Sequence, residues 1–432
     1  MIDLALLRRE PENVAAALAR RGVSADQVSA LIAADVEHRA LMQEAESLRA
    51  KVKDLSRQVG EARRSGDTTT GDALAEESKQ LGEQERAASA RAEEVGATVR
   101  AMHLQIPNIP SPDAPDGLSE EENVELRRWW PGMDKGAPFP TYGDHQRVAH
   151  WDIGTELGIL DLESGARLAG SMFPLYRGDG SRLLRALTQF ALDAHSDAYE
   201  EIRPPSVALT ETMMSTGHLP KSQDDMYAIE RDDLWLIPTG EVPLTSMNRG
   251  EILTAEQLPL RLTAATQCFR REAGAAGRDT RGLLRVHEFE KVELFAYCTP
   301  EQADAAQADI LARAEGLLQQ LGLPYRLLDL CAGDLGAASA RTFDLEVYAP
   351  GVDRWLEVSS VSWFRDYQTR RANVRYRVES GTALVHTVNG SGLAWARIWA
   401  ALVETYRQID GSIALPSALA PYLAGGTTLQ KR

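Results

Sequence analysis

A heptad seam near the N-terminus constrains the fold more than any other feature of this 432-residue chain. Apolar residues recur at alternating spacings of four and three from Leu41 to Val59, and the pattern resumes from Leu74 to Ile106. This spacing is typical of the a and d positions of a coiled coil. Ser65-Gly66-Asp67 and the threonines after it interrupt the seam, as the tip of a hairpin would. The sequence therefore predicts a long antiparallel coiled coil whose first helix runs from about Val28 to Arg64.

The segments on either side of the seam predict where this arm begins and ends. Residues 1 to about 25 are expected to form a short helical lead-in that Pro11 breaks. The proline-rich run from Ile106 to Pro115 cannot continue a helix and is expected to be a linker. We therefore expect an arm at 1–110, a second domain at 111–425 and a mobile tail at 426–432.

Charge is distributed unevenly along the arm. A net charge of -16 argues against general affinity for nucleic acid, so any RNA contact needs a local basic face. From Arg49 to Arg64 six basic residues face two acidic ones, whereas Leu74 to Arg100 has a net charge of -2. The first helix is either a solvated face without a partner or a stripe that contacts phosphates. The stripe includes Arg49, Lys53, Arg57, Arg63 and Arg64.

The three cysteines are expected to be free thiols. Cys268, Cys298 and Cys331 show no CxxC spacing, which fits a reducing compartment better than a disulfide framework or a zinc site. The N-terminal stretch lacks a long apolar core, and no later run is long enough to span a bilayer. We expect a soluble, cytoplasmic protein.

The stretch from Gln267 to Glu293 carries the clearest signs of a binding site. Alternation on both sides of its centre predicts a long antiparallel hairpin with a flexible, cationic tip at Gly274–Gly282. Arg270 and Glu272 are expected on one face, and alternate residues from Arg285 to Glu293, His287 included, on a shared face. Guanidinium groups pair with phosphate and an aromatic ring can cover a base, so this face could hold a nucleotide. An ordinary hairpin with a charged surface loop is the alternative.

The other segments of the second half predict an α+β domain. Alternating residues at Arg341–Tyr348 and Trp355–Val361 predict strands of an antiparallel sheet. Leu183–His195 and Pro300–Leu321 are expected to be helices. From His386 to Arg397 a glycine-rich turn is expected to precede an apolar helix. No Walker A or GxGxxG motif is present, so an antiparallel sheet lined with arginines would have to hold any nucleotide.

These segments together resemble the class II aminoacyl-tRNA synthetases, and the run RDTRGLLRVHEFEKVE resembles the second signature motif of the seryl-tRNA synthetases in particular. The segments around Leu183–Pro205 and His386–Arg397 resemble the first and third motifs. The resemblance implies a coiled-coil arm that grips tRNA(Ser), followed by an antiparallel-sheet catalytic domain flanked by helices, in a homodimer. It also implies activation of L-serine by ATP and Mg²⁺ to seryl-adenylate, and transfer of the seryl group to tRNA.

The resemblance assigns roles residue by residue. Arg270, Glu293 and Arg397 are implied to be catalytic. The residues implied to bind ATP are Arg270, Glu272, Val286, Phe289, Glu357, Ser360 and Arg397. Those implied to bind serine are Thr239, Glu241, Arg270, Glu293, Asn389 and Ser391. Glu357 and Ser360 are implied to hold magnesium, with oxygen ligands suited to it. Without the resemblance, Thr239 and Glu241 would be interpreted as a strand-edge threonine and a surface carboxylate.

The chain departs from the family pattern at a few positions. Gly240 stands between the two serine-binding residues where alanine or serine is usual, and Glu288 and Arg341 replace glutamine and lysine. Val361 and Trp363 follow Ser360, and Ala396 precedes Arg397 in place of glycine. These departures raise the hypothesis of a second synthetase copy, resistant to a serine-mimicking inhibitor or serving a biosynthetic pathway. Activation of serine for another carrier and a non-catalytic coiled-coil descendant are further alternatives.

Overall fold

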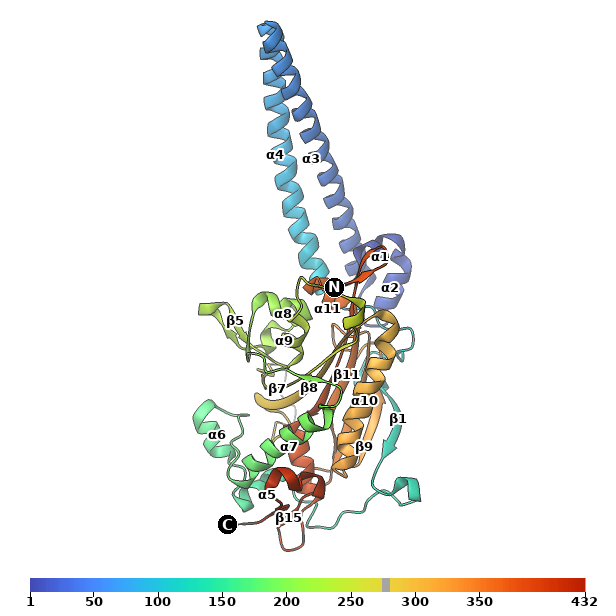
Figure 1. Cartoon of the computed structure of the whole chain (residues 1–432), viewed down its shortest axis with the longest axis vertical. Coiled ribbons are helices and arrows are strands. Elements are labelled where there is room, and N and C mark those ends of the chain that lie inside the picture. The colour runs from blue at the N-terminus through green and yellow to red at the C-terminus, as the bar shows by residue number, and fades with distance from the viewer. Residues whose placement is uncertain (274–279, 432) are drawn as a thin grey trace. The chain divides into compact units, whose positions relative to one another are not determined.

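The computed structural model describes residues 1–273 and 280–431 and divides the chain into two compact units (Figure 1). The first unit is Ile2–Ile106, and the second is Pro107–Arg432 together with Met1. Most of the loop expected at the tip of the hairpin, residues 274–279, lies outside the described residues.

Two long helices, α3 (Ala25–Ser65) and α4 (Thr68–Gln105), make up most of the first unit. α3 begins at a capping box in which Ser24 and Gln27 satisfy each other's backbone donors. It ends at Gly66, whose φ of 83° is left-handed and favours glycine. α4 begins directly afterwards, with Asp67 accepting a hydrogen bond from the Thr70 amide. The threonines expected in the turn are therefore the first residues of the second helix.

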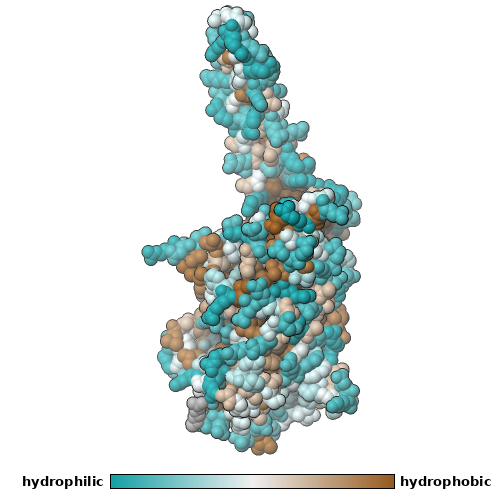
Figure 2. All heavy atoms as spheres, viewed as in Figure 1, coloured by the Kyte–Doolittle hydropathy of each residue, from teal (hydrophilic) through white to brown (hydrophobic). Residues whose placement is uncertain are grey.

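The predicted seam is the contact surface between α3 and α4. Ala45, Ala92 and Val99 are buried along it, while the outer faces are exposed and hydrophilic (Figure 2). Glu85 interrupts the apolar seam, as the sequence indicates, and forms an ion pair of 2.7 Å with Arg49 of the facing helix. The coiled coil thus tolerates a charge because a partner on the other helix neutralises it.

Two short helices precede the arm. α1 (Leu4–Arg9) and α2 (Pro11–Ala19) meet at Pro11, the first residue of α2, where its missing amide costs nothing. Arg8 binds the buried Asp35 of α3 through two hydrogen bonds of 2.8 and 2.6 Å. The hydrogen bond from Arg8 holds the pKa of Asp35 below its ordinary value.

An eight-stranded sheet organises the second unit, in the order β1-β9-β10-β11-β14-β8-β7-β2. All neighbours are antiparallel except β2 and β7, which run parallel at one edge. The strands are β1 (Val124–Trp129), β2 (Glu200–Glu201), β7 (Leu260–Phe269), β8 (Glu288–Cys298), β9 (Tyr325–Asp329), β10 (Arg341–Ala349), β11 (Arg354–Arg365) and β14 (His386–Ala394). This confirms the predicted α+β class.

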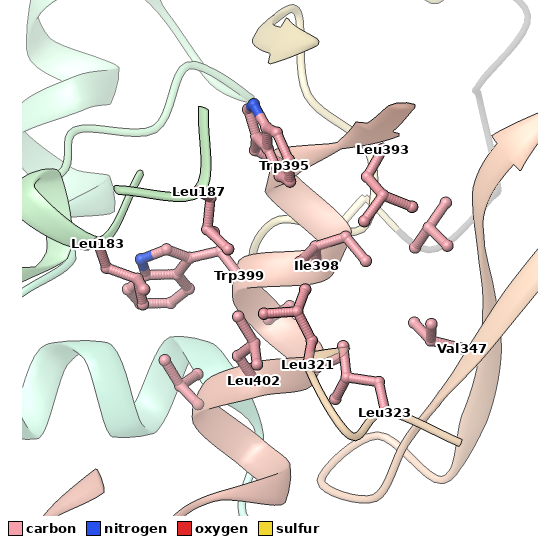
Figure 3. Close-up of a cluster of buried hydrophobic side chains, with 14 of the residues drawn as sticks. Leu183, Leu187, Leu321, Leu323, Val347, Leu393, Trp395, Ile398, Trp399 and Leu402 are labelled. Carbon is pink, nitrogen blue, oxygen red and sulfur yellow. The ribbon is translucent and has the colours of Figure 1, made fainter. Parts of the chain in front are cut away.

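Three helices supply the apolar layer of this sheet: α7 (Asp179–His195), α10 (Ala303–Gln320) and α12 (Trp395–Thr405). The close-up in Figure 3 shows Trp399 of α12 lying between Leu183 and Leu187 of α7, with Ile398 and Leu402 on the same helix. Trp399 is fully buried and donates its indole N–H to the Gly180 carbonyl. Helix α12 therefore anchors the core.

Smaller elements complete the unit. The remaining helices are α5 (His150–Leu157), α6 (Leu162–Ala169), α8 (Thr210–Thr216), α9 (Glu241–Ser246) and α11 (Tyr367–Ala372). The remaining strands are β3 (Val207–Leu209), β4 (Ala228–Ile229), β5 (Leu234–Leu236), β6 (Ile252–Leu253), β12 (Arg375–Val378), β13 (Gly381–Leu384), β15 (Ile413–Ala414) and β16 (Thr428–Leu429). Among the described residues no helix has the length and apolar character needed to cross a bilayer.

The C-terminal segment differs from the mobile tail that we expected. β16 pairs with β15, and Leu429 is buried in the main apolar cluster. Burial of Leu429, which contributes about 2 kcal/mol, and the pairing of β16 with β15 together hold this segment.

We predict that Trp399→Ala lowers the free energy of unfolding of the second unit by about 3–5 kcal/mol, because it removes a large, fully buried ring. Urea unfolding followed by far-ultraviolet circular dichroism measures this. Ile409→Ala, at a side chain that is 89% exposed, is the control and should change stability by less than about 0.5 kcal/mol. Equal urea midpoints for Trp399→Ala and Ile409→Ala would contradict the role of Trp399 as an anchor of the core.

Candidate active site

The central strands carry polar side chains on one face and apolar side chains on the other. Asn389 and Ser391 of β14 line a polar cavity of about 350 Å³, whereas Val388 belongs to the apolar cluster beneath α10. Gly390 also faces α10, since an added Cβ would lie 2.6 Å from Ile310. The segment expected to be a glycine-rich turn is therefore strand β14, and its alternation separates a site from the core.

The polar cavity has a buried charged cluster at its base. Thr239 donates a hydrogen bond of 3.0 Å to Glu293 and accepts one of 2.8 Å from Lys291. Lys291 also forms an ion pair with Glu293, and both side chains are at least 92% buried, with exposed fractions of 8% and 1%. Glu241 begins α9, and its amide donates to the Thr239 hydroxyl. Thr239 and Glu241 therefore converge through a loop and a helix N-terminus, where the sequence suggested a strand.

The carboxyl groups of Glu241 and Glu293 are buried, which disfavours their ionised forms. Burial raises the pKa of Glu293, with Glu241 raising it further and Lys291 opposing the shift. Burial also raises the pKa of Glu241, against hydrogen bonds from Gln368 and Asn389 and the charge of Lys291. Gln368 is itself fixed by the Thr387 hydroxyl, which donates to it over 2.6 Å. A cationic ligand group between the carboxylates would relieve part of this cost.

A second cavity, which we call the aromatic cavity, adjoins the polar one and shares Arg270, Glu357 and Ser391 with it. The guanidinium of Arg270 lies 5.1 Å from the centre of the Phe289 ring. Arg397 donates to the carbonyls of Leu284 and Glu357 over 3.0 and 2.8 Å. The guanidinium groups of Arg270 and Arg397 line the same cavity as the Phe289 ring. The two cations suit a polyphosphate, and the ring suits an attached purine.

Glu272 and Arg285 form the outer wall of the aromatic cavity. They are joined by an ion pair, and Glu272 has a φ of 51°, which is uncommon for a residue other than glycine. Val286 also lines the cavity, although it neighbours Arg285, because the segment before Glu288 is not yet strand. His287, expected on the shared face, does not line either cavity; it contacts the Arg270 carbonyl and Phe173. Strand alternation therefore predicts which side chains line the aromatic cavity only from Phe289 onwards.

A β-bulge brings two proposed magnesium ligands to the same face. Glu357 and Ser360 are three residues apart and would point to opposite faces of a regular strand. The register between β10 and β11 shifts at Leu345/Glu346, so that Val358 has no direct partner. As a result Glu357 and Ser360 both line the polar cavity, beside an acidic groove that contains Asp344 and Glu346.

Two of the departures from the family pattern lie away from both cavities. Val361 is fully buried in the cluster beneath α10, and Trp363 packs on its edge, against His386 and Arg365. Strand alternation turns both side chains to the helix layer, so neither lines a cavity. Gly240 does face the cluster: a Cβ there would lie 3.0 Å from Glu293 Cβ. Ala396 lines the aromatic cavity.

The structure thus brings together every residue assigned to ATP, serine or magnesium, on the walls of two adjoining cavities. Sequence reasoning gave no role to Lys291, His218 or Gln368, which contact this site or line it. Period-two alternation placed Lys291 on the shared face with Phe289 and Glu293, but no role was assigned to it. His218 and Gln368 come from other elements, and no local pattern marks them.

The basic residues of the arm lie on exposed faces of α3. Arg57 pairs with Asp54 and Glu61 over 2.7 and 2.9 Å, and Arg63 lies 3.8 Å from Asp72. Arg64 donates to the Gly60 carbonyl, and Lys53 is exposed. Exposed ion pairs contribute about 0–1 kcal/mol, so phosphates could displace them.

Comparison with known proteins assigns this antiparallel sheet and its cavities to the class II aminoacyl-tRNA synthetases. Residues 226–406 match the family model of the tRNA synthetase class II core domain (G, H, P, S and T), and residues 1–110 match that of the seryl-tRNA synthetase N-terminal domain. The chain is 47% identical to the serine–tRNA ligase of Acidithiobacillus ferrooxidans over 100% of both chains. It is 42% identical to that of Thermotoga neapolitana over 98% of each.

Solved structures agree with the sequence relatives. The seryl-tRNA synthetase of Pyrococcus horikoshii, complexed with ATP, matches with a TM-score of 0.90 and 31% identity over 100% of both chains. The cytoplasmic enzyme of Naegleria fowleri, in complex with AMP, matches with a TM-score of 0.85 and 27% identity over 100% of this chain and 99% of that one. The chain belongs to the seryl-tRNA synthetase family and is an aminoacyl-tRNA ligase.

We predict that Trp363→Asn destabilises the protein without changing the KM for serine, because Trp363 packs on the helix layer. Gly240→Ala should raise that KM by about threefold or more, since Glu293 must move to admit the new methyl group. Serine-dependent pyrophosphate exchange and thermal unfolding measure the two effects. A change in the KM for serine in the Trp363 variant but not in the Gly240 variant would contradict the placement of Trp363 on the helix-facing side of β11.

Proposed function

We propose that this chain activates L-serine with ATP to form seryl-adenylate and then transfers the seryl group to tRNA(Ser) in the cytoplasm. The observation that carries the proposal is the Thr239–Lys291–Glu293–Glu241 cluster, which opens onto Arg270 at the junction of the two cavities. A small zwitterion with a hydroxyl group matches this cluster in charge and polarity.

The polar cavity supports binding of serine. Glu293 would pair with the ammonium group, and Thr239, Glu241, Asn389 and Ser391 would surround the hydroxymethyl group. A buried site built to hydrogen-bond a hydroxyl discriminates strongly against alanine, whose binding leaves these groups unpaired. Lys291 favours the ionised form of Glu293, because its charge opposes the rise in pKa that burial causes.

Adenylation needs alignment and charge neutralisation more than a protein nucleophile. The serine carboxylate attacks the α-phosphorus in line, the new carboxylate–phosphorus bond forms, and pyrophosphate leaves. Arg270 lies between the two cavities and would pair with the α-phosphate, while Arg397 would pair with the γ-phosphate. Phe289 and Glu272 would hold the adenine, and the shared position of Arg270 fixes the two reactants in one geometry.

Magnesium fits the groove beside the phosphates. Asp344 Oδ1 is buried there without a hydrogen-bond partner, and burial followed by the charge of Glu357 raises the pKa of this carboxyl. Glu357 and Ser360 would hold the ion, which typically takes one or two carboxylates with phosphates and water. Bound magnesium would neutralise charge on the leaving pyrophosphate.

We also propose a homodimer and a tRNA-binding role for the arm. The short strand β2 ends the sheet with its neighbours on one side only, which is where a second copy could continue it. The exposed basic residues of α3 would contact the phosphates of the tRNA.

Arg270→Ala should lower the rate of serine-dependent pyrophosphate exchange by at least about a hundredfold, because it removes a charge-assisted contact to the α-phosphate in a partly buried site. The neighbouring Arg271→Ala, at an exposed side chain, is the matched control and should stay within about threefold of the parent. Near-normal exchange by the Arg270 variant would place the chemistry elsewhere.

Glu293→Gln should raise the KM for serine by about tenfold or more, since hydrogen bonds to charged groups contribute about 1.5–3 kcal/mol. In the parent, the KM should rise as the pH falls from 8 towards about 5, because burial raises the pKa of Glu293 above its ordinary value and protonation removes the charge that pairs with the ammonium. Exchange kinetics across this range measure both effects. A flat pH profile in the parent would argue against an ionised Glu293 in serine binding.

Reversing the charge of Lys53, Arg57 and Arg64 to glutamate should raise the KM for tRNA at least about tenfold and leave exchange unchanged, because phosphate contacts lie on the arm. Lys79→Glu, an exposed reversal on α4, serves as the control. Aminoacylation at several salt concentrations measures the effect. Equal loss of exchange in a folded variant would count against a role restricted to tRNA.

A further inference from the structure

A third cavity of about 390 Å³ adjoins the two described above and has no assigned occupant. It meets the polar cavity at His218, Ser222 and Arg270, and the aromatic cavity at Arg270, Glu272 and Arg285. All three cavities therefore share the Arg270 guanidinium. A molecule in the third cavity would therefore lie beside Arg270, the residue proposed above to hold the α-phosphate.

His218 has one ring nitrogen fixed and one available. The Thr216 hydroxyl donates to the Met213 carbonyl over 3.1 Å, and its oxygen lies 2.8 Å from His218 Nδ1. We assign the ring proton to Nδ1, since the Thr216 hydroxyl can then donate to the Met213 carbonyl and accept from the ring. Nε2 is then an unprotonated acceptor, and no described residue forms a hydrogen bond with it. The proposed adenylation step makes no use of this group.

The surroundings keep the imidazole neutral. Burial lowers the pKa of His218 to about 3, and the charges of Arg270, Lys291 and Arg371 act in the same direction. A phosphate bound beside Arg270 would offset part of that positive charge and make Nε2 more basic. The base would therefore be stronger with a nucleotide phosphate at Arg270 than in the empty site.

We propose that the third cavity receives the terminal adenosine of the tRNA, and that His218 Nε2 accepts the proton of its attacking ribose hydroxyl. This inference rests on the function proposed above and assigns a base to its second step. His218 lies on the wall common to the serine cavity and the third cavity, so it faces the attacking hydroxyl from the side opposite the nucleotide wall.

The transfer step balances without a further reactant. The ribose oxygen attacks the carbonyl carbon of seryl-adenylate and forms the ester bond while its proton moves to Nε2. The bond between the carbonyl carbon and the adenylate phosphate oxygen breaks, and its electron pair leaves on AMP. The imidazolium then returns its proton to AMP or to water.

The experiment measures the two steps separately with the full chain. Parent, His218→Ala and His218→Gln are loaded with serine and ATP, then mixed with tRNA(Ser) in a rapid-quench instrument to obtain the single-turnover transfer rate. Pyrophosphate exchange is measured in parallel. Glutamine keeps a polar group near the position of Nε2 but cannot take a proton. His145→Gln, at a histidine that lines none of the three cavities, is the control.

Both His218 variants should lose at least about a hundredfold in transfer rate, and at least about tenfold more than they lose in exchange. Transfer by His218→Gln at the parental rate would overturn the role as a proton acceptor, and so would equal losses in the two steps. If one variant fails to fold, as judged by circular dichroism, the other decides the result. A parent without serine-dependent exchange would instead refute the proposed function, and this inference with it.

Discussion

The separation of polar and apolar faces in the central strands is the constraint on which the rest of the second unit depends. β8, β11 and β14 are buried on both sides, so each strand must supply apolar residues to α10 and α12 and polar residues to the cavities. Polar side chains buried in this way need partners, which explains why Thr239, Lys291, Glu293 and Gln368 form one connected network. Burial of rings such as Trp399 in the helix layer offsets the free-energy cost of burying this polar network.

Much of this arrangement could be predicted from local periodicity. The heptad seam gave both helices of the arm and the position of the turn, because coiled-coil packing depends on spacing alone. The alternation in β8 placed Phe289 and Glu293 on one face, whereas Asn389 and Ser391 were assigned through the family resemblance, in a segment expected to be a turn. Predictions from spacing failed where the backbone leaves regular geometry. Thr239 and Glu241 share a cavity through a helix start, and the segment before Glu288 is not a strand.

The bulge in β11 is an instructive case, because its signal is present in the sequence. Leu356 and Val358 are apolar at one phase, and Val361 and Trp363 at the other, so the pattern slips by one residue between them. Reading that slip would have placed Glu357 and Ser360 on one face and turned Trp363 to the helix layer. Contacts such as Gln368 with Glu241, or His218 with Thr216, join distant or loop segments and have no comparable signal.

The three cavities around Arg270 suggest how electrostatics could order two reactions in one site. Without a nucleotide, burial and then the charges of Arg270, Lys291 and Arg371 hold the His218 pKa low, while burial holds the Glu241 and Glu293 pKa values high. Serine brings an ammonium group to the carboxylates, and the nucleotide brings phosphates to the guanidinium. Each substrate therefore relieves the unfavourable charge that the folded site retains. The imidazole depends on the nucleotide in the same way, since a phosphate at the junction offsets the neighbouring positive charge, although burial continues to lower its pKa.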